Sequence, residues 1–257
     1  MKIVVAYKWA ANPQDAEVRP DGTVDLSRAK AAVSEYDPVA FELARRLADA
    51  TGGEVVGLTV GDSSIDSPLA RKAALSRGLD RLVMVADDAL AGADGTRLAA
   101  VLAAAVTAVG DVDLVLTGDS SVDVAQGQVS MTLAGHLGWL ALGAVSSVAP
   151  AEGGLVVERD LPTGVTTLSL TGPAVLATTS DAAVPRVPGM KDILGAAKKP
   201  VEVLALADLA VEPAAVTLST LSTSRPAEAT RGAVLFDGDA ATAATELVGA
   251  LRLAGVL

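Results

Sequence analysis

The sequence predicts an α/β fold: a three-layer sandwich in which a mainly parallel sheet carries helices on both faces. Apolar runs and helical segments alternate through the first half of the chain, which favours parallel strands joined by right-handed crossovers. Hydrophobic residues make up 51 % of the 257 residues but aromatic residues only 2 %. A core must therefore be aliphatic, as is typical of a sheet that helices bury on both faces.

The first half supplies four expected strands and four expected helices. Asp37-Pro38 and Ser67-Pro68 each place a capping side chain before a proline, which indicates two helix starts. Short apolar runs bounded by turn residues indicate the strands. We expect strands at residues 2–8, 55–60, 81–86 and 113–117, and helices at residues 38–51, 68–77, 96–109 and 123–137.

The second half has a different pattern. Closely spaced β-like runs at residues 141–148, 154–161, 165–170 and 174–179 predict extra, partly antiparallel strands of the same sheet. A loop with a basic end follows at 185–200. Residues 201–231 lack periodicity, which is rare inside a compact domain, so we expect an arm that packs on another chain. We therefore predict an α/β domain at 1–200 and an arm at 201–257 that ends in an amphipathic helix at 240–253.

Composition excludes several kinds of function. The absence of cysteine excludes disulfides and thiolate metal sites, and the single histidine, His136, cannot form a histidine-pair metal site. We expect no metal, and a packing or helix-end role for His136. The net charge of −11 and the few aromatic residues argue against nucleic-acid binding. No uncharged apolar run reaches the roughly 18 residues of a membrane helix, and residues 1–8 do not resemble a signal peptide, so we expect a cytoplasmic protein.

A Gly-Asp-Ser-Ser turn occurs twice, at residues 61–64 and 118–121, each time after a predicted strand. In a parallel sheet such turns share the edge where ligands bind. The helix that follows directs its unpaired N–H groups at the turn, which suits a phosphate. The same residue types also simply cap helices, and Asp119 and Asp123 would repel a phosphate unless they point away from it. Neither a Walker loop nor a G-x-G-x-x-G fingerprint is present.

Four stretches resemble the β subunit of electron-transfer flavoproteins, and the resemblance covers nearly the whole chain. They are IVVAYK at the N-terminus, SEYDPVAFELARRL, DLVLTGDSSVDVAQGQV, and VPRVPGMKDILGAAKKP. The third and fourth are specific in combination. Together with the Tyr-Asp before the first helix, they are most similar to the Fix-type branch associated with anaerobic carnitine and related acyl-CoA reduction.

The resemblance implies a fold of the adenine-nucleotide α-hydrolase type and an αβ heterodimer that carries electrons without bond chemistry of its own. FAD would be shared with the α subunit, and the β subunit would hold AMP or a second FAD. Carried over by position, the nucleotide contacts are Ala6, Asp37, Pro38, Val39, Ala40, Val60, Gly118, Asp119, Ser120, Ser121, Asp123, Gln128, Val129 and Ser130.

The resemblance also implies a docking loop within residues 183–200, with Arg186, Met190 and Lys191 facing an acyl-CoA dehydrogenase or reductase partner. The sequence departs from the family where Lys-Gln often follows the loop glycine and where Asn often precedes Pro38. Here these positions are Asp119-Ser120 and Asp37, so the predicted phosphate site is unusually acidic.

Two rival functions were weighed. An ATP-binding stress-type regulator of the same fold would have a second glycine where Ser121 stands. An adenylate-forming enzyme would need a His-x-Gly-His or Ser-Gly-Gly-x-Asp-Ser loop, and neither motif occurs. The residues favour the prediction of an electron-carrier subunit.

Overall fold

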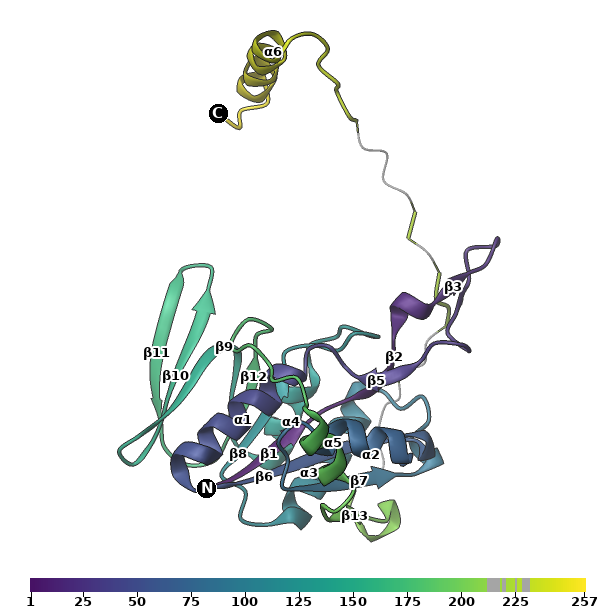
Figure 1. The fold of residues 1–257 in the computed structure, drawn as a ribbon, viewed down its shortest axis with the longest axis vertical. Coiled ribbons are helices and arrows are strands. Elements are labelled where there is room, and N and C mark those ends of the chain that lie inside the picture. Colours follow the sequence, from purple (N-terminus) through teal and green to yellow (C-terminus); the bar gives the residue numbers. More distant parts are fainter. Residues whose placement is uncertain (212–217, 219–220, 225, 228–231) are drawn as a thin grey trace. The chain divides into compact units, whose positions relative to one another are not determined.

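The computed structural model describes the chain except residues 212–217, 219–220, 225 and 228–231 (Figure 1). It contains two compact units, residues 1–223 and 224–257. Within the described residues, no helix combines the length and the apolar run that crossing a membrane requires.

The first unit is built on a nine-stranded sheet of order β11-β10-β9-β12-β8-β1-β6-β7-β13. Neighbouring strands run parallel from β9 to β13, whereas β10 is antiparallel to both β9 and β11. The strands are β1 (Lys2–Ala6), β6 (Glu54–Gly61), β7 (Arg81–Ala86), β8 (Leu114–Gly118), β9 (Leu140–Ala151), β10 (Gly154–Leu161), β11 (Gly164–Leu170), β12 (Ala174–Thr178) and β13 (Val201–Val203).

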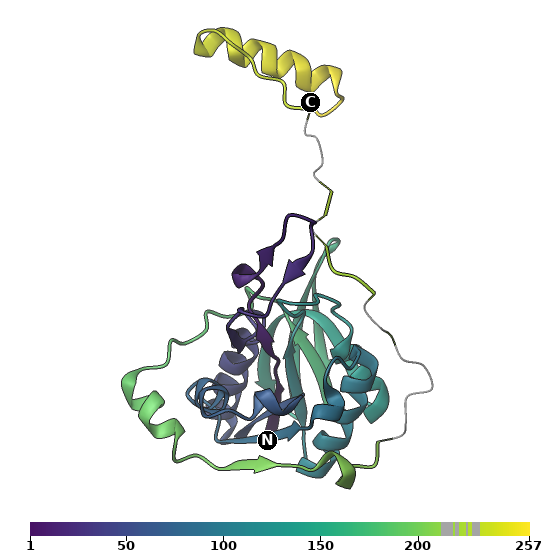
Figure 2. The same ribbon diagram turned by 90° about the vertical axis from the view of Figure 1, so that its right-hand side faces the viewer.

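Helices cover both faces of this sheet, which confirms the three-layer prediction (Figure 2). Alternate residues of β1 separate two aliphatic cores: Ile3 and Val5 pack with α1, α2 and α5, and Val4 and Ala6 pack with α3 and α4. The helices are α1 (Pro38–Thr51), α2 (Pro68–Leu75), α3 (Gly95–Val109), α4 (Val129–Leu137) and α5 (Met190–Ala196).

The strand order places a topological switch beside β1. The chain moves from β1 to β6 and β7 on one side and then returns to β8 on the other. Ile3 pairs with both Val55 and Leu114, so the three strands end at the same edge. A crevice beyond the carboxyl ends of strands at such a point is where ligands of open α/β sheets bind.

The structure differs from the predicted elements in several places. The helix expected from residue 123 begins at Val129. The loop expected at 185–200 contains the two-turn helix α5. Residues 201–203, expected to open an irregular arm, form β13 and pair with β7 at the sheet edge. The polar stretch after β1 forms two small two-stranded sheets, β2 (Trp9–Ala11) with β5 (Ala31–Val33) and β3 (Glu17–Val18) with β4 (Val24–Asp25).

The second unit contains the predicted terminal helix as α6 (Ala240–Leu253), which begins where the Asp239 side chain accepts a hydrogen bond from the Thr242 N–H. None of the residues of α6 is buried within the described part of the chain. Its apolar residues, such as Ala244, Leu247, Val248 and Leu251, recur at helical spacing along one side.

Candidate functional site

A pocket of about 840 Å³ lies at the carboxyl ends of β1, β6 and β8. Both Gly-Asp-Ser-Ser turns line it, as expected from their place after parallel strands. Of the predicted nucleotide contacts, the structure brings together Ala6, Asp37, Val60, Gly118, Asp119, Ser120, Ser121, Asp123, Gln128, Val129 and Ser130. Pro38, Val39 and Ala40 do not line this pocket, and Val39 and Ala40 are buried on the core-facing side of α1.

The first turn closes on itself. Gly61 ends β6, and its carbonyl accepts a hydrogen bond from the Asp87 N–H. The Asp62 carboxylate accepts a hydrogen bond of 2.9 Å from the Ser64 N–H, which starts a single 3-10 turn at Ser63–Ile65. The Ser63 N–H donates to the exposed carboxylate of Asp88. Here the Asp and Ser residues act mainly as caps of a tight turn.

The second turn is attached to the start of α1 instead. The Gly118 N–H donates to Asp37 Oδ1 at 3.2 Å, and the Lys8 N–H donates to Asp37 Oδ2 at 2.8 Å. Asp37 precedes α1 without capping it, because both carboxylate oxygens serve these neighbouring strand ends. A Cβ at position 118 would lie 2.7 Å from the Tyr36 carbonyl oxygen, so only glycine fits this close approach.

The loop after the second turn, residues 119–128, is held by three contacts. The Asp119 N–H donates to the Thr178 carbonyl, and the Val122 N–H donates to Ser34 Oγ. Lys8 Nζ lies 2.7 Å from Asp123 Oδ2, so the carboxylate of Asp123 pairs with a lysine rather than capping a helix.

This arrangement explains why α4 begins late. Ala125 and Gly127 both have positive φ angles, 54° and 62°, which interrupt any helix before residue 128. Gln128 precedes α4 and provides no side-chain cap. Gln128, Val129 and Ser130 line the pocket, and the start of α4 there has no side-chain cap. Such a helix end attracts anions.

Burial changes the electrostatics of two pocket carboxyl groups. It raises the pKa of Asp37 to about 7, although the N–H groups of Lys8 and Gly118 oppose that rise. It also raises the pKa of Asp119, and the negative charge of Asp181 adds to this rise. For Asp123, hydrogen bonding and attraction to Lys8 outweigh burial and lower the pKa.

Sequence reasoning missed several residues of the pocket. Lys8 ended a predicted strand, but only the fold shows that its side chain reaches Asp123 across the pocket. Asp94 caps α3, and Leu98 and Leu102 lie on the same helix, which passes the pocket wall. Their signal was the Asp-Gly-Thr helix start at residues 94–96, which resembles an ordinary cap. Apolar side chains of α3 together with Ala6 and Val60 form a surface that suits a planar base.

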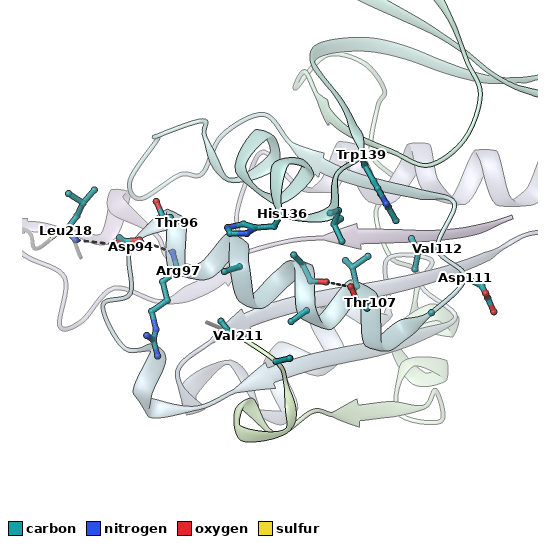
Figure 3. Close-up of a pocket in the computed structure, with 17 residues that line it drawn as sticks. Asp94, Thr96, Arg97, Thr107, Asp111, Val112, His136, Trp139, Val211 and Leu218 are labelled. Atoms are coloured by element: carbon teal, nitrogen blue, oxygen red, sulfur yellow. Dashed lines mark hydrogen bonds between the residues drawn. The ribbon is translucent and has the colours of Figure 1, made fainter. Parts of the chain in front are cut away.

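A second cavity, of about 990 Å³, lies along the outer side of α3 (Figure 3). The helix α3 contributes polar and apolar residues to its lining, namely Thr96, Arg97, Ala100, Ala103, Ala104, Val106 and Thr107. His136 of α4 and Trp139, which follows α4, line it as well. Arg97 projects from the first turn of α3 (Figure 3). This cavity shares Asp94 and Leu218 with the pocket at the strand ends, but no Gly-Asp-Ser-Ser turn contributes to it, so the pocket at the strand ends is the candidate site.

The predicted docking loop has an anchored and an exposed part. Arg186 Nε lies 2.7 Å from Glu42 Oε2, and Arg46 binds the other oxygen of the same carboxylate. These contacts lower the pKa of Glu42 to about 2, with the hydrogen bond from Arg186 as the largest cause. Arg186 therefore fixes the loop to α1. Met190 is 72 % exposed at the start of α5, and Lys191 beside it is also exposed.

Within the described residues, no group of three or more His, Cys, Asp or Glu side chains could hold a metal ion. The chain was also compared with known protein families. A family model described as the electron transfer flavoprotein domain matches residues 21–209. The match covers most of the sheet and the two Gly-Asp-Ser-Ser turns, and it includes the docking loop.

Proposed function

The chain belongs to the electron transfer flavoprotein domain family, and we propose that it is the β subunit of an αβ electron carrier of the Fix-type branch. In this role it does no bond chemistry itself. It helps its α partner to hold FAD, and the flavin carries the electrons while protein side chains supply placement and electrostatics. The proposed location is the cytoplasm.

The pocket at the strand ends is the observation that carries this proposal. Its volume lies within the range of about 300–1,000 Å³ that small-molecule sites occupy. It offers an apolar wall for an adenine ring at Ala6, Val60 and Leu98, and an uncapped helix start at Val129 for one anionic group. We propose that it holds an adenine nucleotide, AMP or the adenylate part of a second FAD.

The second unit supports a permanent partner. An isolated helix of fourteen residues is only marginally stable in water, so the apolar side of α6 needs a surface that covers it. We propose that residues 201–257 include the arm that contacts the α subunit, with α6 as its anchor. The predicted heterodimer provides such a surface.

The docking loop supports a transient partner. Val184, Val187, Met190 and Leu194 are 65 % or more exposed, and they lie in the same segment of the chain as the anchored Arg186; we call them the apolar patch. We propose that this patch contacts an acyl-CoA dehydrogenase or reductase. An exposed methionine suits adaptable, short-lived contacts.

The docking proposal is tested by Met190→Ala in the αβ complex. We expect slower electron transfer between the complex and an acyl-CoA dehydrogenase or reductase, with an unchanged flavin spectrum. Val165→Ala, which truncates a side chain of similar exposure (65 %) on β11, is the matched control. Equal transfer rates for the two variants would contradict the docking role of Met190.

The main experiment is co-expression with a candidate α subunit, followed by extraction and quantification of bound nucleotides by chromatography. We expect a yellow complex with FAD and one further adenine nucleotide per heterodimer. A stable, colourless monomer that does not bind the α subunit would refute the β-subunit role. Retention of ATP by that monomer would favour the stress-type regulator instead.

A further inference from the structure

One buried carboxylate holds the docking loop to α1. Glu42 lies in α1 between the buried residues Phe41 and Leu43, and its side chain is only 7 % exposed. Its Oε2 accepts hydrogen bonds from Arg186 Nε at 2.7 Å and from the Arg186 N–H at 3.3 Å. Its Oε1 accepts a hydrogen bond from Arg46 Nε at 2.7 Å. Both oxygens of Glu42 are therefore bound by arginines, and one of these arginines belongs to the loop.

Few other contacts fix the middle of the loop. Within the described residues, every hydrogen bond that ties residues 184–188 to the rest of the chain involves Glu42 or Arg46, whose guanidinium donates to the Val184 carbonyl at 3.4 Å. Val184 and Val187, on either side of Arg186 in the chain, are 83 % and 91 % exposed. Arg186 thus turns toward α1 while the two valines stay in solvent.

Stability alone is a weak reason for a buried carboxylate at this position. Its neighbours in α1 are buried apolar residues, and a leucine at position 42 would be buried without desolvating a charge. Buried ion pairs often contribute no more stability than an apolar replacement, and in some proteins they instead fix one arrangement of the groups that they join. The group that Glu42 fixes is Arg186, which lies within the segment that carries the apolar patch.

We propose that Glu42 is a positioning residue for the docking loop: through Arg186 it holds the apolar patch in the arrangement that the redox partner binds, without touching that partner itself. This inference rests on the proposed docking of the patch and adds the residue that prepares it. A surface that is already held in its bound arrangement loses less entropy when the partner binds. If the released loop adopts that arrangement about a tenth of the time, the apparent affinity for the partner falls about tenfold.

The test is the steady-state rate of electron transfer between the αβ complex and an acyl-CoA dehydrogenase or reductase, measured over a range of partner concentrations. Glu42→Gln keeps the size of the side chain and removes the charge that both arginines bind. We expect the KM for the partner to rise about tenfold, with kcat, flavin content and flavin spectrum unchanged, because the docked complex is the same once it has formed. A residue that only stabilised the fold would instead lower the flavin content and leave the KM as it was.

A double-mutant cycle with Met190→Ala tests whether Glu42 acts through the loop. Met190 belongs to the apolar patch, so its truncation removes part of the surface that Glu42 positions. In the Met190→Ala background, Glu42→Gln should therefore raise the KM by clearly less than it does in the unmutated complex. Equal rises in the two backgrounds would overturn the inference.

Two further variants separate this role from misfolding and from a general effect of charge. Arg186→Lys keeps the positive charge but loses the planar fork that Glu42 binds, so it should also raise the KM, and it replaces Glu42→Gln if that variant does not fold. Glu54→Gln is the matched control, because Glu54 accepts its hydrogen bond of 2.8 Å from Arg81 on β7 rather than from the loop. It should leave the KM unchanged.

The inference is overturned by an unchanged KM in Glu42→Gln or, if that variant does not fold, in Arg186→Lys. An equal rise of the KM in Glu54→Gln overturns it as well. In those cases the docking role of the apolar patch still stands if Met190→Ala raises the KM. An unchanged KM in Met190→Ala would refute the docking proposal itself, and the inference with it.

Discussion

The two Gly-Asp-Ser-Ser turns have the same four residues and different structures. At residues 61–64 the turn caps itself, and α2 begins at Pro68, shortly after the 3-10 turn ends at Ile65. At residues 118–121 the turn is attached to the buried Asp37, and α4 begins only at Val129. The role of a polar turn residue therefore depends on which groups the fold brings to it. Four sets of substitutions test this contrast.

The largest effect on stability should come from Asp37, the buried residue to which the second turn is attached. Asp37 has a pKa of about 7 in the folded chain, above the ordinary value of 3.8, because it is buried. The folded state thus binds more protons than the unfolded state between about pH 4 and pH 7, so this group's contribution to stability falls as the pH rises through that window. Relative to Asp37→Asn, the unmutated chain should lose about 2–4 kcal/mol of unfolding free energy between about pH 4 and pH 7.

Urea unfolding of both proteins at several pH values measures this difference. Asp88→Asn tests the matching attachment of the first turn. Hydrogen bonding to Ser63 lowers the pKa of the exposed Asp88, so its difference curve should have the opposite sign. Parallel stability curves for Asp37→Asn and the unmutated chain would contradict the assigned burial of the Asp37 charge.

The second-largest effect on stability should come from the first glycine of each turn, Gly61 and Gly118. A Cβ at position 118 would lie 2.7 Å from the Tyr36 carbonyl oxygen and 2.8 Å from Asp37 Oδ1. At position 61 it would lie 3.0 Å from a methyl group of Ile65, which can shift. We expect Gly118→Ala to cost about 1–3 kcal/mol and Gly61→Ala clearly less. Thermal and urea unfolding check this, and equal costs would mean that the two turns are equally constrained.

The third effect is the loss of the self-contained cap. Asp62→Ala removes the acceptor of the Ser64 N–H, and such cap losses cost about 0.5–2 kcal/mol. We expect a loss of unfolding free energy near the low end of this range because the cap is exposed. Asp62→Asn, which keeps an oxygen acceptor, should restore most of it in the same urea titration. A larger loss in the Asn variant than in the Ala variant would argue for a role of the charge.

The smallest effect on stability should come from the ion pair across the pocket. Asp123→Asn breaks a partly exposed bridge to Lys8, and bridges of this kind contribute about 0–1 kcal/mol. The local effect should be larger than the global one, because the bridge fixes residues 119–128. Hydrogen exchange of the amides in this loop should become faster, while exchange in Ser63–Ile65 stays unchanged. Unaltered loop exchange would show that Ser34 and Thr178 hold the loop without the bridge.

Local sequence signals predicted most of the fold. Asp37-Pro38 and Ser67-Pro68 placed the starts of α1 and α2 correctly, because a proline at the first helical position is readable from sequence alone. The apolar runs predicted the central strands, because short apolar runs between turn residues are also visible in the sequence alone. The start of α4 was predicted wrongly at Asp123, since that carboxylate pairs with Lys8, which is distant in sequence, instead of capping a helix.

In the candidate site, too, local sequence signals predicted some residues and missed those whose role depends on distant contacts. Gly118, Asp119 and Ser121 were predicted from the turn itself, and both turns do reach one pocket. Three features could not be predicted, because each depends on contacts between segments far apart in the chain. They are the ion pair of Lys8 with Asp123, the hydrogen bonds that Asp37 accepts from Lys8 and Gly118, and the three-residue strand β13. Long-range hydrogen bonds leave no periodic pattern in the residues that make them.

The chain has only two tryptophans, and they lie at different cavities. Trp9 lines the pocket at the strand ends and packs against the α1 side of the sheet. Trp139 lines the cavity along α3 and packs against the opposite core. Intrinsic fluorescence is therefore resolved by position: in Trp139→Phe the emission reports on the pocket at the strand ends, and in Trp9→Phe it reports on the surface of α3. Two single-tryptophan proteins would follow ligand entry at the strand ends and changes at the cavity along α3 as separate optical signals.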